Sequence, residues 1–139
     1  MAYARNRQCY TVFTNQATAT HSGIAGGVAY GYKVSEFKNC ILQVGTSNSA
    51  NLKVFVKVAC GQTPPDFASS ASKTNQWSYA QVVDIATATP IDGATGIVYS
   101  GTDSVKQVEI NINCVDYICF EIANYSAGQV TAYLTISSD

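Results

Sequence analysis

The sequence predicts an all-β protein, an antiparallel β-sandwich of about eight strands with a jelly-roll-like order. The composition holds 14 Val, 10 Ile, 13 Thr and 9 Tyr but only 3 Leu, a balance that favours strands over helices. Several segments alternate apolar and polar residues with a period of two, and turn-forming residues separate them. The chain has 139 residues, which predicts one domain at 9–139 preceded by an N-terminal arm at 1–8.

The first third of the chain is predicted to alternate strands with one long loop. A strand at 9–14 follows the polar, mildly basic arm. The stretch 15–27 is rich in Ala, Thr, Ser and Gly without an apolar period, which indicates a loop. Apolar and aromatic residues then alternate in a strand at 28–34, and a further strand is expected at 37–44.

The later strands show the alternation most clearly, at 51–60, 105–112, 117–123 and 129–137. Their inward sets are predicted to be Leu52, Val54, Val56 and Val58; Val108, Ile110 and Ile112; Ile118, Phe120 and Ile122; and Val130, Ala132, Leu134 and Ile136. Intervening residues such as Lys57 are predicted to point outward, so these strands should be half-buried and antiparallel.

Turn signals separate these strands, at 45–49, 92–96, 100–104 and 126–128. The longest break, 61–76, contains two prolines and a Ser/Ala run. Loops of that length without structure of their own are uncommon in compact domains, so we expect this one to be functional or ordered by a partner. A strand at 77–85, with Trp77 and Tyr79 near its start, follows it.

Charge and cysteine usage restrict the functional classes. Charged residues make up 12% of the chain and the formal net charge is −1, which argues against a nucleic-acid-binding protein. No run approaches the roughly 20 apolar residues of a membrane helix, and no signal peptide is recognised, so no membrane partner is predicted. The five cysteines are an odd number and are predicted to be reduced, buried and apolar in character.

The search for reactive groups predicts no catalytic residue, no metal site, no cofactor and therefore no enzyme. His21 is the single histidine and lies in a loop without a nucleophile motif, where a solvated side chain is expected. Glu109 and Glu121 lie on consecutive strands, opposite the aliphatic sets. They are expected to be solvated surface acids, and the alternative is a glycosidase pair brought together across two neighbouring strands.

The aromatic residues allow three interpretations: stacking on sugar rings, burial against another subunit, or covering of sheet edges. Those that suggest these uses are Tyr30, Tyr32, Trp77, Tyr79, Tyr99, Tyr117, Tyr125 and Tyr133.

The middle and C-terminal thirds resemble small virion-associated β-sandwich proteins of tailed bacteriophages over about 52–135, whereas 1–27 departs from the pattern. The segments that carry the resemblance are PDF at 65–67, TNQWSYAQVVD at 74–84, IDGATG at 91–96 and GTD at 101–103. The resemblance implies a virion component, either a capsid decoration or cement protein or a small tail-associated protein. It transfers no catalytic or binding residue.

These observations together predict a non-enzymatic capsid decoration or cement protein, located in the virion and assembled in the host cytoplasm. The expected partners are further copies of the chain, with a trimer as the expected oligomer, and the major capsid protein or other virion subunits. The alternative is a tail- or fibre-associated module that binds a receptor or carbohydrate. The predicted partner contacts lie in the N-terminal region and around the long loop, and they are Arg5, Arg7, His21, Pro65, Phe67, Trp77 and Tyr79.

Overall fold

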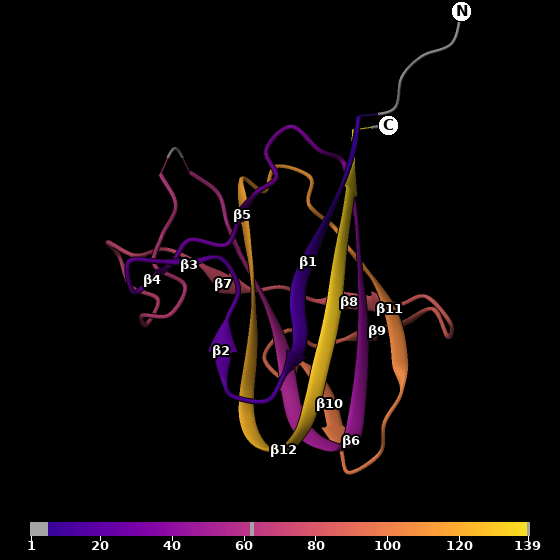
Figure 1. The fold of residues 1–139 in the computed structure, drawn as a ribbon. Helices are drawn as coiled ribbons and strands as arrows, with labels where there is room; N and C mark the ends of the chain where they lie inside the picture. The colour runs from indigo at the N-terminus through magenta and orange to yellow at the C-terminus, as the bar shows by residue number, and fades with distance from the viewer. Residues whose placement is uncertain (1–5, 62, 139) are drawn as a thin grey trace, which may run out of the picture.

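One antiparallel sheet bends over on itself and forms both layers of a β-sandwich (Figure 1). The computed structural model describes residues 6–61 and 63–138; Arg5 lies outside this part of the chain. The prediction of an all-β antiparallel fold is confirmed, and the described residues include no helix that could span a membrane. The strands are β1 (Arg7–Gln16), β2 (Thr20–His21), β3 (Ile24–Ala25), β4 (Val28–Ala29), β5 (Tyr32–Lys33), β6 (Asn39–Ala59), β7 (Ser78–Tyr79), β8 (Val82–Asp84), β9 (Thr89–Ile91), β10 (Ile97–Ser100), β11 (Val105–Ile110) and β12 (Tyr117–Ser137).

Two strands of 21 residues each, β6 and β12, form the centre of both layers. They pair from Ser137 opposite Asn39 at one end to Tyr117 opposite Ala59 at the other. Each bends near its middle, where Asn48 and Asn124 have positive φ angles of 61° and 50°. The turn signals at 45–49 and 126–128 were therefore located correctly, but they bend two continuous strands and do not end them.

The bends divide the sheet into two layers (Figure 1). In the first layer, the C-terminal half of β12 pairs with β1 and with the N-terminal half of β6, and β11, β8 and β9 follow. In the second layer, the N-terminal half of β12 pairs with β2 and β5, and the C-terminal half of β6 pairs with β7 and β10. When each of the two long strands is counted once in each layer, the strand order is β1–β12–β6–β11 in the first layer and β2/β5–β12–β6–β10 in the second. This is the order of the predicted jelly roll, with β6 and β12 each running through both layers.

The core lies between the layers and contains the predicted inward sets. Leu42 and Leu134 of the first layer and Leu52 and Ile122 of the second belong to one buried cluster. At the bend the two long strands approach so closely that a Cβ on Gly128 would lie 2.3 Å from the Cα of Ala50. Gly128 also has a φ of +92°, so both space and backbone conformation require glycine there.

Several predicted strands are shorter than expected because the chain changes its pairing partner within them. The segment 28–34 is interrupted at Gly31, where a Cβ would lie 2.1 Å from the carbonyl oxygen of Ile118. The segment 77–85 pairs first with β6 as β7 and then with β11 as β8. The strands at Thr89–Ile91 and Ile97–Ser100 were not predicted, and β1 begins at Arg7, inside the predicted arm.

The cysteines follow the prediction only in part. Cys40 and Cys119 are buried, but Cys9, Cys60 and Cys114 are exposed, and all five are free thiols. The exposed three lie at the edge strand β1 or in the segments that follow β6 and β11.

Candidate functional site

The outer face of the second layer is covered by another part of the same chain, residues 63–79, which we call the covering segment. Beneath it lie outward-pointing residues of β6 and β12, among them Ala59, 6% exposed, and Cys119, fully buried. Phe67 of the covering segment is also fully buried and packs with them, with Ala29, and with half-buried Trp77. The face that sequence alternation assigns to solvent is therefore a second, smaller core.

The covering segment is ordered by contacts within the chain. The carboxylate of Asp66 accepts hydrogen bonds from the backbone of Ala29 and Ala68 and from the hydroxyl of Ser69. The side chain of Asn75 accepts from the backbone N–H of Asp66 at 2.8 Å and donates to its carbonyl at 2.9 Å. The hydrogen bond from Ser69 is the largest cause that keeps the pKa of Asp66 below its usual value. These hydrogen bonds within the chain fix the conformation of the long loop.

A group of three ionisable side chains, the Lys57 cluster (Lys57, Glu121 and His21), lies at the edge of this second core. The Nζ atom of Lys57 is 3.1 Å from the Glu121 carboxylate and 3.0 Å from Nε2 of His21. It also donates to the carbonyl of Phe67 at 2.9 Å, so all three of its N–H groups have acceptors within reach. Nε2 of His21 is 3.2 Å from the other oxygen of Glu121. The cluster joins three strands to the covering segment.

Burial keeps the imidazole of the cluster uncharged at pH 7. Lys57 is 4% exposed, and its ammonium lies 4.3 Å from the centroid of the Trp77 ring, a cation–π contact. Loss of solvation is the largest cause that lowers the pKa of His21; Lys57 lowers it further, while Glu121 and Asp66 raise it. The imidazole is therefore neutral at pH 7, and Lys57 and Glu121 form the ion pair.

A pocket of about 300 Å³ opens beside the cluster. The rings of Trp77 and Tyr79 stand edge-on, 5.2 Å apart at 87°, and the indole N–H of Trp77 donates to the carbonyl of Ser69. The pocket is lined by Lys57, Ala68, Ser69, Ser70, Ala71, Trp77, Tyr79 and Glu121. Aromatic rings, hydroxyl groups and one carboxylate in a shallow pocket are chemically suited to a polar ring such as a sugar.

The structure brings four of the predicted contact residues to one region: His21, Phe67, Trp77 and Tyr79. The expectation of a solvated His21 is wrong because Lys57 and Glu121 enclose it, leaving its side chain 14% exposed. Phe67 is completely buried and therefore offers no surface to a partner. Pro65 lies half-buried beside Asp66, while Arg7 lies on the first layer.

The sequence did not predict the Lys57 cluster, since Lys57 and Glu121 were expected to face solvent. Phe55 could have indicated the covered face, because it occupies an outward position on the same strand as Lys57, yet is large and apolar. The glycosidase pair is also not formed. Glu109 pairs with Ile41 in the first layer and Glu121 pairs with Phe55 in the second, because β6 lies between β11 and β12.

The outer face of the first layer contrasts with the covered one, and we call it the bare face. Its central row runs across four strands through Thr11, Tyr133, Gln43 and Gln107. The amide of Gln107 donates to that of Gln43 at 3.3 Å. The remaining outward residues of these strands are Arg7, Cys9, Thr131, Thr135, Ser137, Asn39, Ile41, Gly45, Val105 and Glu109. Among these described positions, only Arg7 and Glu109 carry charge.

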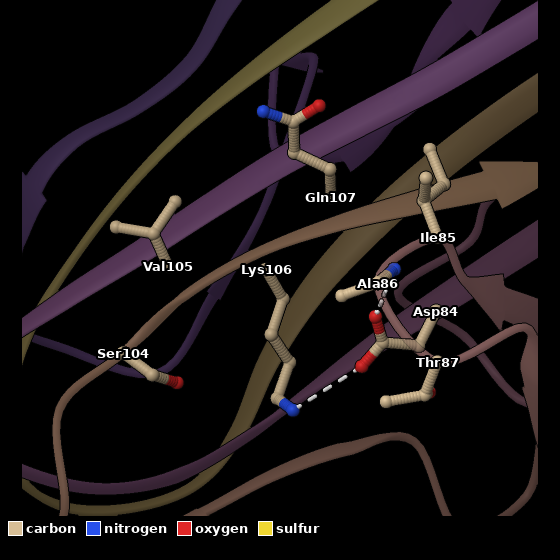
Figure 2. Close-up of a pocket in the computed structure, with 8 residues that line it drawn as sticks. All are labelled: Asp84, Ile85, Ala86, Thr87, Ser104, Val105, Lys106 and Gln107. Atoms are coloured by element: carbon tan, nitrogen blue, oxygen red, sulfur yellow. Dashed lines mark hydrogen bonds and ion pairs between the residues drawn. The ribbon is translucent and has the colours of Figure 1, made fainter.

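The bare face exposes large apolar groups, and a neighbouring ion pair lies on the opposite side of strand β11. Tyr133 is 46% exposed and Val105 is 67% exposed. Figure 2 shows the pocket of about 480 Å³ at the β11 edge, with Val105 and Gln107 on one side of the strand and Lys106 on the other. Lys106 pairs there with Asp84 at 3.5 Å (Figure 2), so this ion pair adds no charge to the bare face.

The comparisons with known proteins concern the fold. No protein-family model and no curated protein matches the chain. Among solved structures, the SPBc2 prophage-derived protein YomS is similar, with a TM-score of 0.68 and 8% sequence identity. The match covers 99% of this chain and 98% of YomS. At this identity the likeness shows a shared fold across the full described domain, found in a protein derived from a prophage.

Proposed function

We propose that this chain is a non-enzymatic structural protein of a phage particle that works by packing its bare face against neighbouring subunits. The observation that carries the proposal is the bare face itself, a four-stranded surface with two charged residues and exposed Tyr133, Ile41 and Val105. Charged residues are depleted at the centre of protein interfaces and tyrosine is enriched there. The prophage origin of the structural neighbour supports a phage-related role.

The specific role that we propose is capsid decoration or cementing, with the shell stabilised through contacts among copies of the chain and with the major capsid protein. Such a role needs large neutral surfaces and no reactive site. In the Lys57 cluster, the ammonium and the carboxylate already bind each other. This internal pairing supports a structural use of the cluster over a catalytic one.

The test is incorporation into particles. We expect the chain to be found by mass spectrometry in purified particles produced by a host that carries the gene. A Gln43→Glu, Tyr133→Glu double variant should be lost from the particles, because it places two charges in the centre of the bare face. A Thr87→Glu variant, exposed outside the bare face, is the matched control and should still be incorporated. Particles that lack the wild-type chain, or that retain the double variant, would contradict the proposal.

A second candidate function is carbohydrate binding at the pocket beside Trp77. The observation that favours it is the convergence of Trp77, Tyr79 and the Glu121 carboxylate on one opening of about 300 Å³. Glycan-array binding that disappears in Tyr79→Ala, whose ring is 41% exposed, would support this function. Tyr133→Ala, which changes a similarly exposed tyrosine on the bare face (46%), is the matched control. An array without binding would reject the candidate.

A further inference from the structure

The two charges of the bare face lie symmetrically about its central strands. Arg7 is on β1 and Glu109 is on β11, and the paired strands β12 and β6 lie between them. Within the sheet, Arg7 faces Ser137, and Glu109 faces Ile41 and Val83, all of them uncharged. At the rim, Lys38 and Glu109 line the same groove of about 440 Å³. Thus a cation marks one side of the face and an anion marks the other.

This arrangement is complementary to itself under a two-fold axis. An axis that runs parallel to the strands, between β12 and β6 and above the sheet, places β1 of one copy over β11 of the other. Cys9 lies in the same cross-strand row as Ile41 and Glu109. Arg7 lies two residues before Cys9 on β1, so it is offset from Glu109 by two residues along the strand direction. Packed sheets are separated by about 10 Å, and two residues along a strand span about 7 Å. The Arg7 and Glu109 side chains can bridge that offset, and symmetry forms the pair twice.

We propose, on the basis of the proposed structural function, that a second copy of this chain packs face to face on the bare face, with Arg7 of each copy paired to Glu109 of the other. The remaining contacts are uncharged, with Tyr133 of one copy over Gln43 of the other. This isologous pair has two copies and therefore differs from the trimer expected from the sequence.

The size of the face fits a weak contact. Four strands at about 4.8 Å spacing and seven residues at about 3.4 Å give roughly 460 Å² for each copy. The pair would then bury about 900 Å² in total, slightly less than the roughly 1,000 Å² of a stable specific interface. Contacts of this size belong to weak, transient complexes, so we expect a dimer that dissociates on dilution.

A charge swap tests the pairing directly. Sedimentation velocity over a concentration series should give a dimer for the wild type. Arg7→Glu alone and Glu109→Arg alone should each weaken dimerisation by about tenfold, because each converts two attractive contacts into repulsive ones. The double variant Arg7→Glu, Glu109→Arg should restore the wild-type dissociation constant to within about threefold. Lys73→Glu and Glu36→Arg, exposed charges outside the face, are the matched controls and should leave it unchanged.

Thiol labelling provides a second readout that distinguishes this face from other contacts. Cys9 is exposed on the bare face and Cys60 is exposed beyond the second layer. In the dimer Cys9 should be protected from a maleimide reagent, while Cys60 reacts as it does in the monomer. A dimer in which Cys9 stays reactive, a double variant without rescue, a trimer or a monomer at all concentrations would overturn the pairing. Incorporation of the wild-type chain into particles would leave the proposed function standing in each of these cases.

Discussion

The two outer faces of the sandwich are built by the same pair of strands and yet have opposite properties. Lys57 and Glu121 point outward from β6 and β12 in the second layer, and Gln43 and Tyr133 point outward from the same strands in the first. The charged pair lies under the covering segment with its hydrogen bonds satisfied. The uncharged residues remain open to solvent. The chain thus encloses the Lys57–Glu121 pair on one face and leaves an uncharged surface open on the other.

The two faces are therefore expected to serve different purposes, the covered face for stability and the bare face for association. Contacts on the covered face bind one part of the chain to another, so changes there should alter the free energy of unfolding. The residues of the bare face are half-buried or exposed, so changes there should alter association while the fold remains. Each of the following experiments compares the two faces, beginning with the largest expected effect.

Phe67→Ala should lower the free energy of unfolding by about 3–4 kcal/mol, because it empties the centre of the second core. Urea unfolding followed by Trp77 fluorescence measures the change. The thiol of Cys119, whose pKa burial raises to about 11, should also become faster to alkylate as the covering segment loosens. Cys9, exposed on the other layer, is the internal control and should react equally in both proteins. An unchanged rate at Cys119 would mean that Phe67 does not hold the cover in place.

Lys57→Met should destabilise the fold by about 3 kcal/mol. The substitution leaves the Glu121 carboxylate without its ion-pair partner and the Phe67 carbonyl without its donor. Lys53→Met is the matched control, since Lys53 is half-buried on the same side of the same strand, nearer the bend. The two variants can be compared by urea unfolding at pH 7. Equal effects would contradict the special role of the Lys57 cluster.

Acidification should weaken the covered face through His21. Its pKa is lower in the folded protein than the usual 6.5, chiefly because of burial. The unfolded chain therefore takes up the proton first, so the stabilisation is complete above about pH 6.5 and decreases as the pH falls toward the folded pKa. The slope should stay below about 1.4 kcal/mol per pH unit, the limit for one proton.

Thermal unfolding between pH 7.5 and 5 measures this effect, with His21→Gln as the comparison. The variant should show a flatter profile over the same range because glutamine does not titrate. A wild-type profile as flat as that of the variant would rule out the histidine as the acid-sensitive group of the covered face.

Tyr133→Thr, on the bare face, should change the free energy of unfolding by less than about 0.5 kcal/mol. The tyrosine is 46% exposed and threonine keeps the preference for a strand. The same variant should nevertheless weaken self-association in sedimentation velocity. A large loss of stability with unchanged association would reverse the roles that we assign to the two faces.

Alternation in the sequence was sufficient to predict the inner faces of the main strands. Val108 and Leu134 are fully buried, as expected, because a period of two is a local property of extended chain. The same alternation predicted outward positions correctly but not their surroundings. Whether Lys57 meets water depends on Phe67, ten residues away, and on His21, 36 residues away. Such contacts leave no periodic signal.

The turn signals and the strand neighbours show the same limit. In the sequence, Gly128 indicates only that the chain changes direction. The structure shows that Gly128 packs closely against Ala50, so that both long strands bend at the same place. Glu109 and Glu121 lie on consecutive long strands, yet β6 separates those strands. Chain order could not reveal this, because pairing in the sheet is set by long-range contacts.

The sequence by itself determined that this protein would be all-β, which residues would point inward, and that few charges would be available for its surface. The tertiary structure decided where those charges lie and which face remains open. The physical reason is that β6 and β12 bend together, so both outer faces arise from the same strands. A remote segment then covers one face, through the Lys57 cluster and Phe67, and leaves the other without a cover.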